Sequence, residues 1–553
     1  MNEIDALKQH IRLLDGMDRE RQNWFPHWRE VASMFFPRRF DSLLGGAEIR
    51  RQAPMRNTDL LDSTSIKALN ILASGMMNGV TSPSRKWLNL PSRTMKDSQA
   101  LSSYYAQCEE VMLKALSNSN FYNTMANLFL EWAGFGTACL FIREDFEDIF
   151  RCYLSPIGEY YLSTDATGRV NRVGRRFSLS FEAAIQEFGI DAFPKELQDR
   201  ARDKQRLLEP IAINYILERN DPKDGLLSVP AEAREVYWLI GTTDEKHKYL
   251  SIRPVREWPA ITPRWMVHGS SSYGTAPTME AYPDVVELQA LSLRMAQGVD
   301  KMISPPLIVD AQLRHRPKAL GAGGVTYASN VNANFGAKPA YQVQIPVLEL
   351  HTLLQDLRDR VRSALHNDLF NMISQLETVR SATEIDARRE EKLIHLGPVL
   401  ERFYEEGLVP AIRRIYGIMR RAGMFPEPPE EVDPADLEVH FESILSNAQM
   451  SADVTAIERF FSFTGQLAAV YPEVQRIPNT TSLLRKYAKG LGIRPDQLTS
   501  DEELAAIAEE ESARAALAET AAIGGEFAKG AQVLSQTDVG GGMNALQEVM
   551  GSL

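Results

Sequence analysis

The sequence lacks the features that organise several large classes of protein. Its three cysteines, Cys108, Cys139 and Cys152, have neither paired spacing nor nearby histidines, which argues against a disulfide framework and a zinc site. We expect three buried free thiols. No stretch approaches the roughly 18 to 20 uninterrupted apolar residues of a membrane helix, so no membrane partner is expected. Because the N-terminus is charged and amphipathic, unlike a signal peptide, we expect a soluble protein made in the cytoplasm.

Catalytic machinery is also missing from the sequence. The nine histidines are scattered, and the HExxH, Gly-x-Ser-x-Gly and GxxxxGK[ST] patterns are absent. Carboxylates and cations alternate in one predicted helix: Glu384, Asp386, Glu390 and Glu391 with Arg388, Arg389 and Lys392. This arrangement is typical of a solvated helix face rather than of a two-metal nuclease. We predict a protein that is not an enzyme and binds no cofactor.

The composition indicates an ordinary globular protein with several subdomains. Hydrophobic residues make up 44% and charged residues 24% of the chain, unlike a disordered protein. Its 553 residues exceed what one hydrophobic core usually organises. The net charge of −12 argues against a protein that wraps tightly onto DNA, since such proteins carry a strong basic surface. A protein past which DNA slides is compatible with this charge.

Two helical runs on either side of a polar break dominate residues 345–423. The first run has an apolar face at three- and four-residue spacing: Leu350, Leu353, Leu354, Leu357, Val361, Ala364 and Leu365. The second run opens with Thr383 as a plausible N-cap and ends at Gly423. The segment 371–381 between them has no helical periodicity and is too polar to bury.

Short motifs cluster around this break and recur elsewhere in the chain. They are Glu377–Ile385, Arg388, Glu390, Leu396-Gly397-Pro398, Leu408-Val409-Pro410, Phe135-Gly136-Thr137, Pro156–Tyr161, Asp165-x-x-Gly168, Arg264-Trp265, Tyr273–Pro277 and Tyr282-Pro283-Asp284. Together they resemble the portal proteins of short-tailed bacteriophages, the head-to-tail connectors of the T7-like kind.

The resemblance implies an α+β, mostly helical fold with a mixed α/β wing, a two-helix stem, a small clip, a long wing helix and a helical crown. The implied parts are a wing (1–280, helical and then antiparallel strands), a stem helix (281–304), a clip (305–346), a second stem helix (347–370), a channel loop (371–382), a long wing helix with a return strand (383–445) and a helical crown with a disordered tail (446–553).

The resemblance also implies a homo-oligomeric ring, typically dodecameric, at one capsid vertex of the virion. Double-stranded DNA would pass through it non-specifically during packaging by a separate terminase motor and during ejection. The implied partners are the terminase large subunit, the major capsid and scaffolding proteins, and the tail adaptor and tail tube proteins. Assembly would take place in the host cytoplasm.

The implied clip is rich in turn-forming and basic residues. It has short strand-like runs at 307–309 and 341–345. We predict that four cations contact the motor or tail: Arg314, Arg316, Lys318 and Lys338. The glycines at 321–324 are not a nucleotide loop, because no strand followed by Lys-Ser or Lys-Thr accompanies them.

The implied channel loop is the candidate DNA contact. Its predicted DNA-facing residues are Gln375, Glu377, Thr378, Arg380 and Ser381. Arg380 can reach a phosphate, and Glu377 keeps the local charge balanced so that the contact stays transient. Alternatively, Arg380 pairs with Glu377 or Glu384 near a helix start.

One other class of function fits the helical pattern. A structural scaffold or tail assembly protein without a channel would also contain long helices. Such a protein has no need of a mobile polar loop between stem and wing helices, so segment 371–381 favours the portal.

Overall fold

The structure is a computed structural model that divides into two units, each described by itself. Unit 1 comprises Met1–Arg93, Gln107–Pro428 and Asp433–Gln449, and unit 2 comprises Thr94–Ala106, Pro429–Val432 and Met450–Leu553. The described residues are 3–37, 60–84, 86–90, 99–221, 231–241, 249–310, 324–328, 337–340, 345–374, 396–427, 440–441, 456–467, 471, 480–490 and a few between 507 and 533. Helices and antiparallel sheets are both present, which confirms the α+β class.

Helices form the first part of the chain. They are α1 (Glu3–Gln22), α2 (Phe25–Phe35), α4 (Thr64–Val80), α5 (Gln99–Asn118) and α6 (Phe121–Phe135). Residues 3–35 form two helices rather than one, because Pro26 has no backbone N–H and is accommodated in the first turn of α2. The aromatic face of α2 is buried, with Trp28 fully enclosed and Phe35 almost so.

Two antiparallel sheets follow these helices. The smaller has the order β3-β2-β9, from β2 (Cys139–Asp145), β3 (Ile149–Ser155) and β9 (Ala260–Ile261). The larger runs β4-β5-β6-β7-β8, from β4 (Tyr160–Thr164), β5 (Val170–Ser180), β6 (Pro210–Arg219), β7 (Ala233–Leu239) and β8 (Ser251–Val255). Two short helices, α7 (Phe181–Phe188) and α8 (Lys195–Arg200), lie between β5 and β6.

Helix α1 packs on the larger sheet through an apolar cluster and one buried polar group. Leu7, Leu14 and Met17 contact Ile216 and Trp238. Beside this cluster, His10 Nε2 lies 3.0 Å from the Glu218 carboxylate. Burial would raise the pKa of Glu218, but the hydrogen bonds from His10 and Arg234 lower it to about 2. The buried carboxylate therefore stays ionised and paired at neutral pH.

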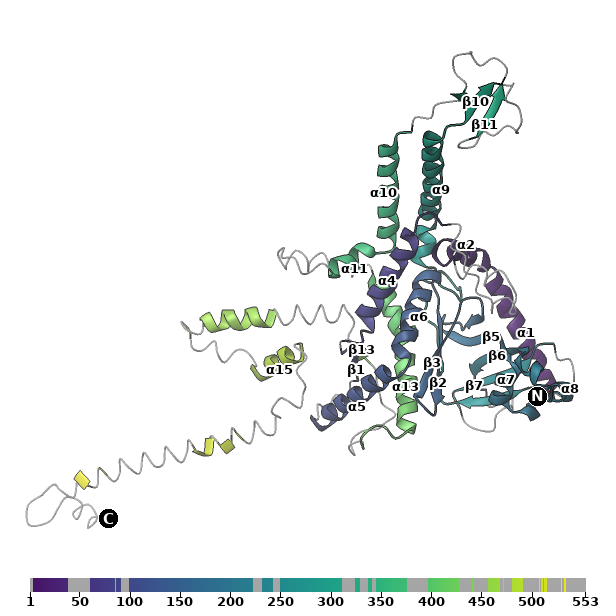
Figure 1. Cartoon of the computed structure of the whole chain (residues 1–553). Coiled ribbons are helices and arrows are strands. Elements are labelled where there is room, and N and C mark those ends of the chain that lie inside the picture. The colour runs from purple at the N-terminus through teal and green to yellow at the C-terminus, as the bar shows by residue number, and fades with distance from the viewer. Residues whose placement is uncertain are drawn as a thin grey trace, which may run out of the picture. The chain divides into compact units, whose positions relative to one another are not determined.

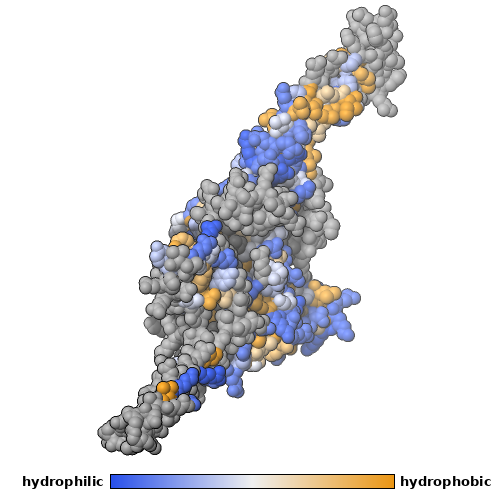
Figure 2. Space-filling view, turned by 90° about the vertical axis from the view of Figure 1, so that its left-hand side faces the viewer, coloured by the Kyte–Doolittle hydropathy of each residue, from blue (hydrophilic) through white to orange (hydrophobic). Residues whose placement is uncertain are grey.

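A pair of antiparallel helices lies side by side and leads to a small sheet (Figure 1). Helix α9 (Pro277–Ile303) packs Leu288 against Leu354 and Leu357 of α10 (Val347–Ala364). Three short strands lie between the two helices in the sequence. Strand β10 (Leu307–Asp310) pairs in parallel with β11 (Val325–Ala328) and antiparallel with β12 (Ala337–Pro339). Figure 2 shows apolar side chains at the surface of this helix pair, next to the segment that carries β10–β12.

The second predicted stem helix ends earlier than expected. Helix α10 ends at Ala364, and His366 has φ 53°, a left-handed conformation that stops the helix. A separate helix, α11 (Asn367–Ser374), then leaves in a new direction (Figure 1). The prediction of one helix over 347–370 is therefore wrong, and so is the prediction that the polar break begins at Asn371.

The turn at His366 is stabilised by what it buries. Phe370 of α11 sits on Gly75 of α4, where a Cβ atom would lie 2.2 Å from the phenyl ring. The Asn367 amide is also buried, and its nitrogen donates to the carbonyl of Ala68, 2.8 Å away. A straight continuation of α10 would lose both contacts.

The remaining described elements complete the two units. A helix over 396–403 passes through a π-helical turn, Tyr404–Leu408, into α13 (Val409–Arg421), which ends before Gly423 as predicted. Strand β13 (His440–Phe441) pairs with β1 (Leu88–Asn89). In unit 2 a helix spans 456–467 and α15 spans Thr480–Gly490, joined by a 2.7 Å hydrogen bond from Tyr487 to Glu458. Within the described residues, no helix is both long and apolar enough to cross a membrane.

The Gly75–Phe370 contact can be tested by adding one methyl group. We expect Gly75→Ala to lower the thermal unfolding midpoint, since forcing a methyl group into packed surroundings costs roughly 1 to 3 kcal/mol. Gly16→Ala in α1 is the matched control, because a Cβ there meets nothing within 4 Å. The control should raise the midpoint, because alanine is favoured over glycine in a helix by about 1 kcal/mol in the free energy of unfolding. If both variants raised it equally, α11 would not be packed on α4 as described.

Candidate functional site

The residues predicted to contact DNA and the motor lie almost entirely outside the described residues. This holds for Gln375, Glu377, Thr378, Arg380 and Ser381 of the channel loop and for Arg314, Arg316 and Lys318 of the clip. The backbone of Lys338 is described, in β12 opposite Ile308. These site assignments stay predictions. The structure does describe what flanks the loop, namely α11 before it and, after it, a helix described from residue 396 onward.

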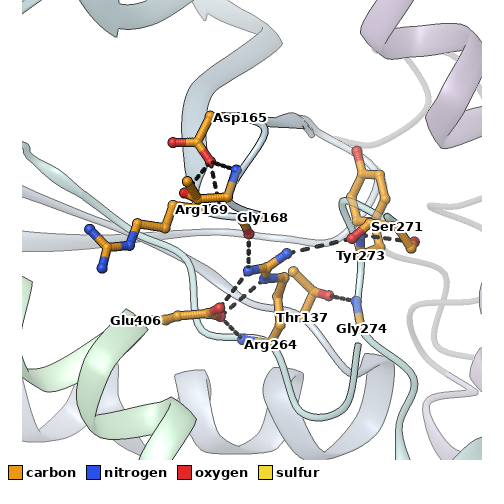
Figure 3. Close-up of polar contacts among 10 residues, drawn as sticks. Thr137, Asp165, Gly168, Arg169, Arg264, Ser271, Tyr273, Gly274 and Glu406 are labelled. Carbon is orange, nitrogen blue, oxygen red and sulfur yellow. Dashed lines mark hydrogen bonds and ion pairs between the residues drawn. The ribbon is translucent and has the colours of Figure 1, made fainter. Parts of the chain in front are cut away.

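The helix that follows the loop is anchored by one buried arginine, Arg264, shown in Figure 3. Its side chain is 4% exposed and binds Glu406 of the π-helical turn, with Nε 3.1 Å from Oε2. The backbone N–H of Arg264 donates to the same oxygen at 3.0 Å. The guanidinium also donates to the carbonyl of Gly168 at 2.7 Å. Three segments far apart in the sequence thus meet at one side chain.

The turn between β4 and β5 presents the Gly168 carbonyl. Asp165 Oδ1 accepts hydrogen bonds from Thr167 N at 2.8 Å, Thr167 Oγ1 at 2.6 Å and Arg169 N at 3.0 Å. The hydrogen bond from the Thr167 side chain is the main reason that the pKa of Asp165 is lowered. Gly168 has φ 80°, which favours glycine. The Asp-x-x-Gly motif therefore aims a backbone oxygen at Arg264.

The segment that contains Arg264 is also fixed against the end of α6. Gly136 has φ 75°, and a Cβ there would lie 2.3 Å from the carbonyl oxygen of Gly274. A Cβ on Gly274 would lie 2.5 Å from the carbonyl oxygen of Gly136. Gly274 N donates to Thr137 Oγ1 at 2.8 Å. Glycine is required at both positions, and the close approach sets where α9 begins, three residues later.

The π-helical turn has a cause in the sequence. Pro410 cannot donate to the carbonyl of residue 406, and its ring clashes with that carbonyl in a regular α-helix. Widening the preceding turn relieves the clash. Phe403, just before the turn, stacks on Phe129 of α6 and lies tilted against Trp132, at 4.9 and 4.6 Å between ring centroids. The Leu-Val-Pro motif thus turns Glu406 toward Arg264 while Phe403 holds the helix on α6.

Arg264, with its partners Glu406 and Gly168, forms a junction that holds three segments of unit 1 together. The guanidinium donors are directed at carboxylate and carbonyl oxygens, and within the described ranges no group of three His, Cys, Asp or Glu side chains could hold a metal ion. The three cysteines are buried thiols that form no disulfide, as predicted. Burial raises the pKa of Cys139 and of Cys152 to about 12, so neither thiol is reactive at neutral pH.

Most residues of the junction could be singled out from the sequence, but what they contact could not. Arg264, Gly168, Thr137 and Gly274 stand in the motifs that carry the family resemblance, whereas Glu406 was missed. A carboxylate four residues before Pro410 was the available signal, since the altered turn gives that side chain a new direction.

The junction predicts a large loss of stability when its charge pair is broken. Glu406→Gln leaves the buried Arg264 without its counter-charge, so we expect a loss of roughly 3 kcal/mol in urea unfolding. Asp356→Asn is the matched control, because its pair with Arg360 is more than half exposed and contributes under about 0.5 kcal/mol. Equal small effects of the two substitutions would show that the Arg264–Glu406 pair is not important for stability.

Comparisons with known proteins fit this architecture. The family model described as "Bacteriophage head to tail connecting protein" matches residues 7–498. The portal protein of Salmonella phage epsilon15 is 31% identical over 95% of both chains. The probable portal protein of Bordetella phage BPP-1 is 30% identical over 96% of this chain and 95% of its own. A solved structure titled "Virion of native gene transfer agent (GTA) particle" covers 77% of this chain and 89% of its own at 10% identity and a TM-score of 0.31, too low to support an argument. The chain belongs to the family of bacteriophage head-to-tail connecting proteins.

Proposed function

We propose that this chain is a portal subunit that forms a homo-oligomeric ring at one vertex of the capsid. The ring is the channel through which a separate terminase motor packages double-stranded DNA and through which the DNA leaves on infection. It also carries the tail. The chain itself is not an enzyme, and it assembles in the host cytoplasm before becoming part of the virion.

The near full-length similarity to two portal proteins is the observation that carries this proposal. Both relatives align over at least 95% of this chain, so the similarity spans all the segments that this proposal assigns to the wing, stem, clip and crown. A scaffold without a channel would not be expected to align over its whole length with proteins named as portal proteins. The alternative of a non-channel scaffold is therefore the weaker one.

The stem pair α9–α10 supports self-association. Large apolar side chains lie at its surface: Val286, Leu293, Met302, Ile303, Val347, Leu348 and Leu353. Ile303, the last residue of α9, and Leu348, near the start of α10, are 75% and 81% exposed. Figure 2 shows apolar surface on this helix pair. An apolar surface of this kind marks an interaction site, and copies of the stem packed around a central axis would cover it.

The overall charge supports passage rather than retention of DNA. Phosphates recur about every 1.7 Å along the duplex axis, so a strongly basic lining would hold the DNA in place. With a net charge of −12, the chain can supply an acidic channel with cations confined to the loop and clip. Sliding requires such weak contacts.

Ring formation depends on the exposed stem in this proposal. We expect the wild-type protein to form rings, and Ile303→Asp combined with Leu348→Asp to shift it to monomers, because carboxylates would be buried at the contact. Leu208→Asp, at a 70% exposed site away from the stem, is the control and should leave rings intact. Mass photometry at micromolar concentration measures the outcome. A wild-type chain that stayed monomeric at every salt concentration would contradict the proposal.

The loop has its own test. Replacing residues 375–380 with a Gly-Ser linker should leave rings and capsid attachment intact but reduce packaging or retention of DNA. Arg380→Gln should have part of this effect, while Arg380→Lys, which keeps the charge, should not. The DNA content of purified heads is the measurement. Normal DNA content in the linker variant would remove the loop from the transport mechanism, and loss of rings would make the segment an assembly element.

A further inference from the structure

The hairpin that joins β2 to β3 ends in a phenylalanine held entirely in solvent. Phe146 is 111% exposed relative to its reference value, whereas Phe150, four residues on, is completely buried. The turn is ordered, because Asp145 Oδ1 accepts a hydrogen bond from Glu147 N at 2.8 Å. A large aromatic side chain is thus presented at the tip of a defined turn rather than packed against its own chain.

Backbone strain accompanies this exposed side chain. Ile149, which pairs with Asp145 where the strands meet the turn, has φ 71°. A left-handed residue is expected in a three-residue hairpin loop, but it is normally glycine or asparagine. A β-branched residue there is an outlier, and such strain gathers at functional positions. The same hairpin thus contains a strained residue, Ile149, and an exposed aromatic residue, Phe146.

The charge around Phe146 indicates what would cover it. Four carboxylates surround it in sequence: Glu144, Asp145, Glu147 and Asp148. Arg421 of α13 forms an ion pair with Glu144. Arg151 and Asp148 lie 4.0 Å apart, the limit of an ion pair, and both side chains are about half exposed or more. The outer part of the tip is thus an apolar knob in an acidic rim. Its complement is an apolar pocket rimmed by lysine or arginine.

The position of the hairpin separates it from the other proposed contacts. Arg421 and Arg414 of α13 bind Glu144, which fixes the hairpin on the body of unit 1. The stem pair α9–α10 lies between this body and the clip strands (Figure 1). The clip is the proposed contact with motor and tail, and the apolar stem is the proposed contact between copies. Phe146, in the turn between β2 and β3, belongs to neither surface.

We propose that the tip of the β2–β3 hairpin docks into the protein shell of the head, with Phe146 inserted into an apolar pocket that basic residues surround. This inference rests on the proposed function. It adds the residues and the chemistry of one contact with the shell.

The buried native cysteines allow a direct test. Because none of the three is exposed, Phe146→Cys introduces one accessible thiol into the full chain. Its alkylation by iodoacetamide is measured in purified rings and in heads assembled with the shell proteins of the same phage. We expect at least tenfold slower alkylation in heads than in rings. Leu208→Cys, at another exposed site, is the control and should react equally in both.

Assembly gives a second readout. Phe146→Asp should form normal rings but reduce the number of rings in heads at least fivefold, whereas Phe146→Tyr should enter heads like the wild type. Equal alkylation of Phe146→Cys in rings and heads would overturn the inference, and so would protection already present in free rings, which would place the contact between copies. A wild-type chain that formed no rings, or rings that never entered heads, would overturn the proposed function together with this inference.

Discussion

The buried guanidinium of Arg264 imposes a constraint on which much of unit 1 depends. A charge removed from water must be paired and hydrogen-bonded, because its desolvation costs several kcal/mol. The chain meets this requirement with a carboxylate from the π-helical turn and a carbonyl from the β4–β5 turn. The larger sheet, the segment leading into α9 and the helix over 396–421 can therefore adopt only arrangements that bring those oxygens together.

Steric constraints fix the same region where electrostatics do not. The reciprocal approach of Gly136 and Gly274 leaves no space for a side chain, and Pro410 forces the wide turn that directs Glu406. On the other side of the predicted channel loop, the left-handed His366 and the packing of Phe370 on Gly75 set where α11 leaves α10. The described elements on both sides of residues 375–395 are thus held by packed, specific contacts.

Periodicity predicted the elements whose burial is regular, and it failed where single residues decide the backbone. The apolar face of α10 was visible in the sequence. Strand β6 carries no alternation that would mark it, although Pro210–Arg219 lies in the centre of the sheet, because its buried run of 213–218 is continuous. The break at His366 was missed because helical spacing continues through it to Phe370. The junction was found only as motifs, since pairing between residues 142 positions apart leaves no local signal.

The assignment to the family and the proposal of a channel depend on different observations. Similarity over nearly the whole chain shows the family, while the channel depends on how copies of the exposed stem meet. Cryo-electron microscopy of the purified full-length protein tests this most directly. We expect closed rings with a central hole, with α9 and α10 of neighbouring copies in contact and residues 375–381 facing the hole. Particles without a central opening, or rings in which the stem helices face solvent on all sides, would contradict it.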